Sequence, residues 1–184
     1  MKKSLILGSL LVLSLSAPAF AESSVAVGGM AMYPSKNIVQ NAVNSADHTT
    51  LVAAVKAAGL VPTLEGTGPF TVFAPTNAAF AALPAGTVET LLKPENKAML
   101  AKVLTYHVVP GIHESSAIRA AIMAGNGKAT MKTVEGEMLT FMMNGAANIV
   151  VQDGKGNTAD IIVYDVKQSN GVIFSVDKVL LPSG

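Results

Sequence analysis

Hydrophobic positions follow a helical period in the first half of the chain and a strand period in the second half. In residues 51–58 the apolar side chains fall three or four positions apart, and Gly59 then supplies a helix end. From residue 129 onward, short runs rich in valine and isoleucine alternate with turn pairs such as Asn144-Gly145. Early helices followed by strands that pair in antiparallel fashion are typical of an α+β domain.

Element boundaries follow from the same pattern. The spacing of apolar residues, with capping and turn residues at the ends, predicts helices at 38–43, 49–58, 78–83, 87–92, 94–104 and 116–124. The second of these would take Asp47 or Thr49 as its N-cap. Strands are predicted at 70–74 and 105–109, ahead of the late strands. Alternation within the first of these strands predicts that only one of its faces is buried.

Residues 1–21 have the organisation of a secretory signal peptide. Lys2 and Lys3 precede an apolar run over residues 5–15, and Ala19-Phe20-Ala21 matches the small-residue cleavage signal. The apolar run is shorter than the ~20 residues that a membrane-spanning helix needs, and no later run reaches that length. We therefore expect no transmembrane segment and an exported protein, which resides in the periplasm or is extracellular, at the cell surface or beyond it.

Residues 22–36 show no sustained period and contain a Gly28-Gly29 pair. Small residues and glycines favour a flexible chain, so a flexible N-terminal arm is expected here. Met30 and Met32 lie two positions apart and present thioethers, which bind soft metals such as copper(I), although an ordinary arm without a metal is the alternative. No linker or internal repeat follows, so residues 37–184 are expected to form one domain.

Charge and cysteine content exclude several classes of protein. The whole sequence carries 13 basic and 12 acidic side chains, and loss of Lys2 and Lys3 with the signal peptide would leave 11 basic against 12 acidic. Such a balance offers no basic surplus for phosphates, so no nucleic-acid partner is expected. The sequence has no cysteine, which excludes disulfides, thiolate catalysis and cysteine-bound metal centres. An exported chain of this kind must be held together by its core.

Three blocks of sequence resemble the signature blocks of the fasciclin domain family. Residues 68–80 contain Gly-Pro-Phe-Thr-Val-Phe-Ala-Pro-Thr-Asn, residues 104–111 contain Tyr106-His107, and residues 170–180 begin with Asn170-Gly171. The blocks occur in the order and at the separations usual for the family, and the resemblance covers about residue 37 to the C-terminus. It implies a fasciclin-like wedge of two β-sheets with helices packed on one side.

Short polar residues in these blocks have roles that their positions predict. Thr76 and Asn77 follow a strand and precede a helix, so their side-chain oxygens are expected to accept helix N–H groups. His107 lies in an apolar strand and is expected to be a buried, neutral imidazole bonded to backbone rather than a catalytic group. Asp177 is expected to accept hydrogen bonds from backbone or hydroxyl groups. Asn170-Gly171 is a turn signal.

The resemblance implies adhesion, so the chain would be a module that binds cell-surface or extracellular-matrix proteins or polysaccharides. In matrix members of the family, a Tyr-His motif and an aspartate–isoleucine pair are linked to partner binding. The matching positions here are Tyr106, His107, Asp165 and Val166, with valine in place of isoleucine. An exposed Asp165 carboxylate would suit a partner's arginine or metal, whereas the alternative is a carboxylate that caps a strand turn. Phe174 stands where the family commonly has histidine, which argues against a role that needs a second histidine in this block.

No enzyme is predicted. The sequence lacks G-x-S-x-G, H-E-x-x-H, Walker and dinucleotide-binding motifs, so no catalytic residue and no cofactor is expected. His107, His113 and Glu114 are residues of metal-binding types, but their spacing across Pro110-Gly111 does not direct them together, and no metal site is expected. Useful adhesion by one small domain needs many copies, a multivalent partner or weak self-association. The alternative function is a periplasmic binding protein for a small apolar ligand or a soft metal.

Overall fold

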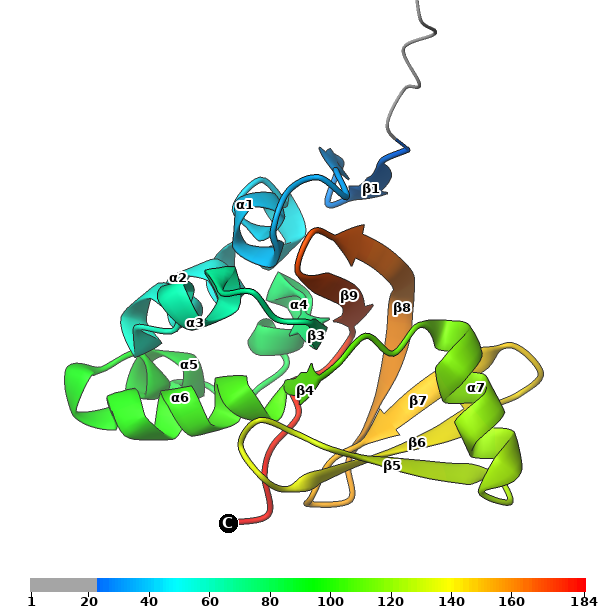
Figure 1. Ribbon diagram of the computed structural model, residues 1–184. Helices are drawn as coiled ribbons and strands as arrows, with labels where there is room; N and C mark the ends of the chain where they lie inside the picture. The colour runs from blue at the N-terminus through cyan, green and yellow to red at the C-terminus, as the bar shows by residue number, and fades with distance from the viewer. Residues whose placement is uncertain (1–22) are drawn as a thin grey trace, which may run out of the picture.

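The computed structural model describes residues 23–184, and Figure 1 shows their arrangement. The predicted signal peptide falls on residues 1–21, outside the described residues. The helices are α1 (Ile38–Ala42), α2 (Thr49–Ala58), α3 (Val61–Glu65), α4 (Asn77–Ala81), α5 (Thr87–Leu91), α6 (Lys97–Tyr106) and α7 (Ser115–Ala124), with the 3-10 turns η1 (Ala46–His48) and η2 (Pro94–Asn96). The strands are β1 (Val25–Val27), β2 (Met30–Met32), β3 (Phe70–Pro75), β4 (Val108–Pro110), β5 (Lys128–Lys132), β6 (Met138–Asn144), β7 (Asn148–Gln152), β8 (Thr158–Gln168) and β9 (Gly171–Val176).

A mixed sheet of seven strands, in the order β4-β3-β9-β8-β7-β6-β5, carries the fold. Its neighbours pair antiparallel except β3 and β9, which run parallel. The long strand β8 pairs with β7 through its first residues and with β9 through the rest, and its register shifts between Ile161 and Val166. These shifts bend β8, so that the sheet divides into the two halves of a wedge (Figure 1). Helices α1 to α6 lie on one side of this wedge, and the α+β fold class is confirmed.

Two hydrophobic cores lie on opposite faces of β3 and β9. The helical core packs α1, α2, α3 and α6 against Val72 and Ile173. The sheet core lies inside the curved sheet and under α7, and it contains Phe73, Phe141 and Phe174. The prediction of a single buried face for the first strand was therefore wrong. Strand β3 is buried on both faces because each face meets a different core.

The expected flexible arm is instead a β-hairpin over part of its length. Strands β1 and β2 pair antiparallel around Gly28 and Gly29, whose φ angles are 60° and 74°. The buried amide of Asn41 accepts from the Tyr33 N–H at 3.0 Å and donates to the Tyr33 carbonyl at 2.8 Å. Met32 is buried in the helical core. The Gly28-Gly29 pair between Val25–Val27 and Met30–Met32 is itself a two-residue hairpin signal that was interpreted as flexibility, and the contacts with α1 and the core add to its order.

The helix that precedes the Tyr-His motif is longer than expected. Residues 105–109 were predicted to be a strand, but α6 continues through Tyr106, and His107 is its C-cap. Only Val108–Pro110 pair as a strand, with β3. The β-branched and aromatic residues that suggested a strand are compatible with a last helical turn when tertiary packing buries them, as it does Tyr106.

Candidate functional site

The three signature blocks meet as neighbouring strands. Strand β3 from the first block runs parallel to β9 from the last block, from Phe70 opposite Gly171 to Pro75 opposite Val176. Strand β4, which follows the Tyr-His motif, pairs with the other edge of β3. A side chain at Gly171 would collide with the Phe70 carbonyl, so the strand start requires glycine. The blocks therefore build the centre of the sheet.

Both residues of the Tyr-His motif are buried. The Tyr106 hydroxyl donates to the Met138 carbonyl at 3.0 Å, and burial raises the pKa of Tyr106 to about 12. His107 donates from Nδ1 to the Val103 carbonyl at 2.8 Å and accepts the Leu180 N–H at Nε2 at 2.9 Å. Burial lowers the pKa of His107 to about 4. The prediction of a neutral, buried imidazole bonded to backbone is confirmed, and neither side chain lies at the surface for a partner.

The capping role of Thr76 and Asn77 is confirmed, although the two residues cap different helices. Thr76 accepts the Ala79 N–H at 3.2 Å and so caps α4. Asn77 accepts the Thr50 N–H at 2.9 Å and donates to the Ala46 carbonyl at 2.8 Å. The start of α2 is thus capped from another helix, and the prediction of a local N-cap at Asp47 or Thr49 was wrong.

Asn170 joins three parts of the fold that are distant in sequence. Its side chain accepts the Ile38 N–H at 3.0 Å and donates to the carbonyls of Leu64 and Gly66, each at 2.8 Å. The asparagine therefore holds the start of α1 and the end of α3 against β9. Asp177 accepts the Asp160 N–H at 2.7 Å, which confirms its predicted role as a hydrogen-bond acceptor.

Asp165 and Val166 do not form an exposed pair. Val166 is fully buried, and Asp165 is half-buried with a φ of 54°, in the left-handed region, where β8 changes register. The Asp165 carboxylate accepts the Ser115 N–H at 2.7 Å and also the Ser115 hydroxyl. It caps the N-terminus of α7 across the sheet, and both sequence interpretations, an exposed carboxylate and a strand-turn cap, are corrected.

A second buried histidine was missed by the sequence analysis. His48 contacts the Ser45 hydroxyl through Nδ1 at 2.8 Å and the Ser175 hydroxyl through Nε2 at 3.2 Å. All three side chains are buried, and burial lowers the pKa of His48. Ser175 lies 127 residues away along the chain, so no local signal marks the cluster.

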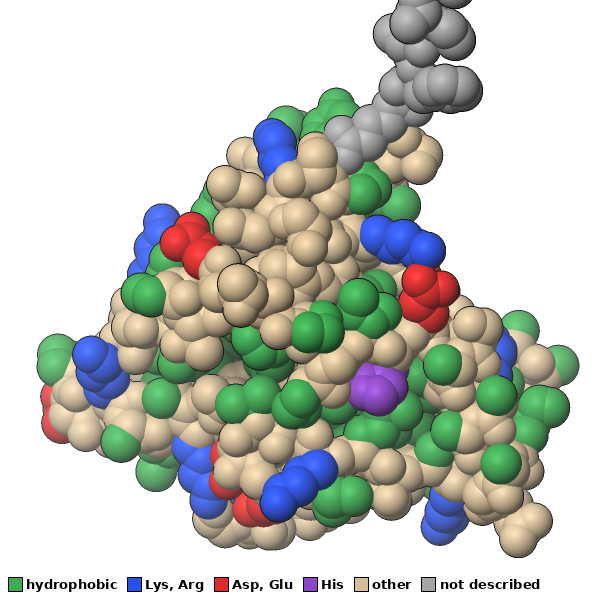
Figure 2. Space-filling view, viewed as in Figure 1, with side chains coloured by type: hydrophobic (Ala, Val, Ile, Leu, Met, Phe, Trp, Pro, Cys, Tyr) green, Lys and Arg blue, Asp and Glu red, His purple; other side chains and the backbone are tan. Residues whose placement is uncertain are grey.

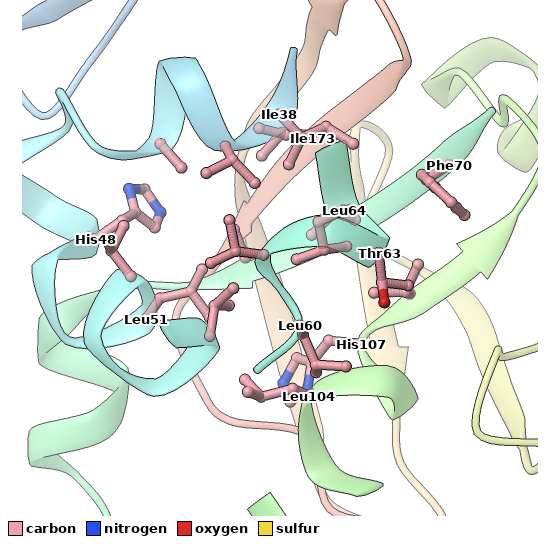
Figure 3. A pocket seen from close by; sticks show the side chains of 18 of the residues that line it. Ile38, His48, Leu51, Leu60, Thr63, Leu64, Phe70, Leu104, His107 and Ile173 are labelled. Atoms are coloured by element: carbon pink, nitrogen blue, oxygen red, sulfur yellow. The ribbon is translucent and has the colours of Figure 1, made fainter. Parts of the chain in front are cut away.

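An apolar cavity of about 70 Å³ lies within the helical core, between α1, α2, α3, α6 and the strands β3 and β9. Figure 3 shows its wall, with Ile38, Leu51, Leu64, Leu104 and Ile173 among the lining side chains. His48 and His107 also line it, but their ring nitrogens bond to other groups. The surface that the lining residues present to the cavity is apolar. No single sequence motif marks it, because its residues come from many separate elements.

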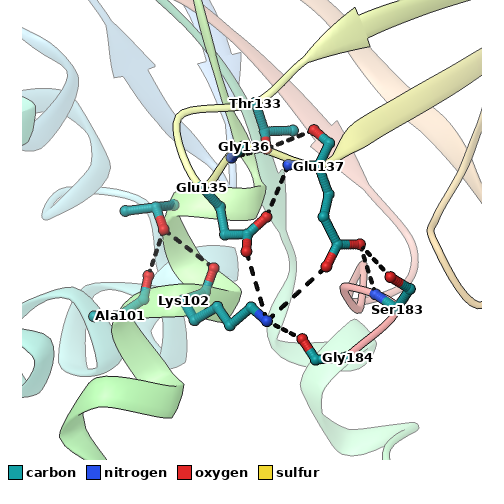
Figure 4. Close-up of polar contacts among 9 residues, drawn as sticks. Ala101, Lys102, Thr133, Glu135, Gly136, Glu137, Ser183 and Gly184 are labelled. Carbon is teal, nitrogen blue, oxygen red and sulfur yellow. Dashed lines mark hydrogen bonds and ion pairs between the residues drawn. The ribbon is translucent and has the colours of Figure 1, made fainter.

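A polar network ties the C-terminal residues to the β5–β6 turn (Figure 4). The Ser183 N–H and hydroxyl each donate to Glu137 Oε2 at 2.7 Å, and these bonds lower the pKa of Glu137. Lys102 Nζ lies 3.6 Å from Glu135 Oε1 and 3.9 Å from Glu137 Oε1, and it donates to the Gly184 carbonyl. The network holds the last residues beside α6.

The methionine pair does not form one site. Met30 is 51% exposed, whereas Met32 is buried. Within residues 23–184, no group of three or more His, Asp or Glu side chains is placed to hold a metal ion. In the same part of the chain, no helix is both long and apolar enough to span a bilayer.

The fold is an α+β wedge, and the three signature blocks form its central strands. This wedge is the architecture that the resemblance to the fasciclin domain implied. The family model described as "Fasciclin domain" matches residues 46–182, so the chain belongs to the fasciclin domain family. It is 49% identical over 163 residues to protein sll1483 of Synechocystis, covering 88% of this chain and 82% of that one. It is 35% identical over 161 residues to immunogenic protein MPB70 of Mycobacterium bovis, covering 85% and 72%.

A solved structure agrees with this assignment. The structure is the FAS1 domain pair from the insect cell adhesion molecule Fasciclin I, with a TM-score of 0.69 and 15% identity. The match covers 87% of this chain and 58% of that chain, and at this identity it shows the fold. The resemblance inferred from the three blocks is confirmed. Another relative, 36% identical over 161 residues, is the cell surface glycolipoprotein MPB83 of Mycobacterium bovis, and the match covers 85% of this chain and 64% of that protein.

Proposed function

We propose that this chain is an exported interaction module without enzymatic activity, which binds cell-surface or extracellular-matrix proteins or polysaccharides. Its membership of the fasciclin domain family carries this proposal. Tyr106 and His107 support partner binding from the interior, through the positions of α6 and β4, because both side chains are buried. Exposed residues must therefore make the contact with a partner.

We place the contact surface on the outer side of α7 and the loop before it, and call it the α7 face. Ser116, Ala120 and Met123 are exposed at helical spacing on α7, and the exposed Ile112 lies in the loop just before the helix. Ile112 and Met123, at its two ends, are 56% and 71% exposed. Figure 2 shows hydrophobic side chains over this region beside a histidine. Asp165 and Val166 would act here as positioning residues, since Asp165 caps α7.

A multivalent binding assay tests this proposal. The mature protein, coupled to tetravalent streptavidin, should bind cells of the source organism, matrix proteins or polysaccharides, because several weak contacts add up. The double variant Ile112→Ser/Met123→Ser should lose about tenfold or more in apparent affinity. Met99→Ser is the matched control, since Met99 is equally apolar and exposed but lies on α6. Failure of the unaltered protein to bind any of these surfaces would remove support for the proposal.

A second candidate function is the binding of a small apolar ligand, and the apolar cavity favours it. A cavity of about 70 Å³ exceeds the ~10–15 Å³ that one water needs, and apolar cavities of this kind stay dry. Native mass spectrometry of protein purified from its source should then find an additional noncovalent mass that organic extraction removes. A bare protein mass under gentle ionisation would contradict the second candidate.

A further inference from the structure

The cavity in the helical core has room for a slender chain. Its volume of about 70 Å³ is well below the ~300–1,000 Å³ of pockets that enclose drug-sized ring systems. Its wall consists mainly of branched aliphatic side chains, among them Leu51 from α2 and Ile173 from β9 (Figure 3). Such a wall makes dispersion contacts with methylene groups and offers nothing to a polar ligand.

The buried polar groups around the cavity already have hydrogen-bond partners. His48 bonds to two serine hydroxyls, and His107 bonds to two backbone groups. The Thr105 hydroxyl donates to the Ala101 carbonyl at 2.7 Å. Among residues 23–184, no buried side-chain nitrogen or oxygen lacks a hydrogen-bond partner. A group with hydrogen-bonding atoms would therefore find no partner inside, and the part of a ligand that enters must be hydrocarbon.

The rim of the cavity carries a positive charge. Lys56, Thr63 and Val134 are the exposed residues in its lining, so they mark where it opens. Because Lys56 is exposed and the cavity surface is apolar, we expect its methylene stem to line the cavity and its ammonium group to remain in water. The Lys97 ammonium group lies beside Gly59, three residues after Lys56. Glu135, next to Val134, is paired with Lys102 at 3.6 Å.

We propose that the cavity binds the hydrocarbon tail of a fatty acid, an unbranched chain with one carboxylate, and that Lys56 attracts the carboxylate at the rim. The aliphatic wall selects the tail, and the ammonium group selects the head. This inference rests on the second candidate function above and names the ligand class for it. The buried Met32 of β2 closes the cavity on the hairpin side, where its flexible thioether can adjust to tails of different length.

A chain-length series on the unaltered, delipidated protein is the first test. Isothermal titration at about pH 8, where fatty-acid carboxylates are ionised, compares butanoate, hexanoate, octanoate, decanoate and dodecanoate. Affinity should rise about fourfold per methylene until the cavity is full and then level off. An absence of binding by the whole series, or affinity that does not depend on chain length, would overturn the proposal.

Methyl NMR locates the bound tail in the same unaltered protein. Decanoate should shift the methyl resonances of Ile38 and Ile173, which line the cavity. It should leave those of Ile118 and Ile149, in the sheet core, in place. The opposite pattern would place the ligand elsewhere and contradict the inference.

Substitutions distinguish recognition of the ligand's carboxylate from recognition of its hydrocarbon tail. Lys56→Gln should weaken decanoate binding about two- to fivefold and leave binding of uncharged decanol unchanged. Lys155→Gln is the matched control, because Lys155 is exposed in the loop between β7 and β8 and does not line the cavity. Val55→Phe fills the cavity and should abolish binding of both ligands, and its thermal unfolding shows whether it is folded. Equal effects of Lys56→Gln and Lys155→Gln would refute the role of Lys56.

The two levels of proposal fail differently. If protein from the source carries a bound apolar mass but no fatty acid binds, the second candidate function stands and the ligand class is wrong. If decanoate binds as described but the native protein is bare, the cavity has the proposed chemistry and the second candidate function fails.

Discussion

The two cores of the wedge differ in how completely their side chains fill them. In the sheet core the Phe73 ring lies 5.2 Å from that of Phe141 and 5.5 Å from that of Phe174, and Tyr164 meets Phe174 edge-on at 6.1 Å. The helical core is mainly aliphatic and keeps a cavity of about 70 Å³. Hydrogen-bonded strands fix the walls of one core, whereas short helices line the other. Stability is therefore concentrated in the sheet core, and space for a ligand in the helical core.

Truncation of a large side chain should expose this difference most strongly. Phe141→Ala should lower the free energy of unfolding by ~3–5 kcal/mol, because it leaves a cavity among rigid strands. Leu51→Ala, on the cavity wall of the helical core, should cost ~2–3 kcal/mol. Urea unfolding followed by circular dichroism measures both. A larger loss for Leu51→Ala would reverse the assignment of stability to the two cores.

Acid should act at the boundary between the cores, where His107 lines the cavity and bonds to Leu180 of the sheet core. The pKa of His107 is about 4 when folded and 6.5 in the unfolded chain, so the unfolded state binds more protons between these values. The contribution of the neutral His107 imidazole to the free energy of unfolding is fully present above pH 6.5. It is lost as the pH falls toward 4, by about 3 kcal/mol in all. The lowered pKa of His48 acts in the same direction.

Substitution tests the same residue at neutral pH. His107→Ala should lower the free energy of unfolding by ~1–3 kcal/mol, because the Val103 carbonyl and the Leu180 N–H lose their partner. It should also flatten the acid dependence seen in urea titrations at several pH values. His113→Ala is the control and should keep the acid dependence, since the His113 imidazole makes a solvent-exposed hydrogen bond to the Pro110 carbonyl and none in a core. An unchanged stability of His107→Ala would show that the imidazole is not a structural link.

The α7 cap affects the sheet half of the wedge more mildly. Asp165→Ala removes the acceptor for Ser115 and should cost ~1–2 kcal/mol. Asp165→Asn keeps an oxygen acceptor and tolerates the positive φ of 54°, so it should cost less than ~1 kcal/mol. Thermal unfolding ranks the two variants. If Asp165→Asn proves as costly as Asp165→Ala, the charge matters more than the cap.

Enlargement of a side chain gives the smallest and sharpest contrast. Val55→Leu adds a methylene beside the cavity and should change the free energy of unfolding by less than ~1 kcal/mol. Val151→Leu makes the same change in the fully buried sheet core and should cost ~1–3 kcal/mol. Thermal unfolding of the two variants compares their losses of stability. Equal costs would mean that the cavity cannot accept added carbon.

Local signals predicted the elements better than the contacts between them. The Thr76 cap, the late hairpins and the buried His107 followed from neighbouring residues and were confirmed. The end of α6 at Tyr106 was not predicted, because burial overrode the strand propensity of these residues. The hairpin of residues 25–32 was missed because the Gly28-Gly29 pair, a hairpin turn signal, was interpreted as a sign of flexibility, and its contacts with Asn41 and the helical core lie outside the local sequence.

The candidate site shows the same division. The three blocks were sufficient to recognise a resemblance to the fasciclin domain family, and the family model that matches residues 46–182 confirms it. The partners of Asn77, Asp165 and Asn170 were out of reach, since each caps or joins a helix distant in sequence. The apolar cavity is assembled from strands and helices across the chain, so periodicity alone gave no sign of it.

By itself, the sequence determined most of the helices, the late strands, the blocks that resemble the fasciclin family, and that no cysteine chemistry is available. Only the tertiary structure decided which faces are buried, how β8 bends, and that Tyr106, His107 and Val166 lie inside. The physical reason is the distance along the chain over which each effect acts. Hydrophobic period, capping and turn preference act over a few neighbouring residues, whereas burial, cavities and long-range caps depend on elements that meet only when the chain folds.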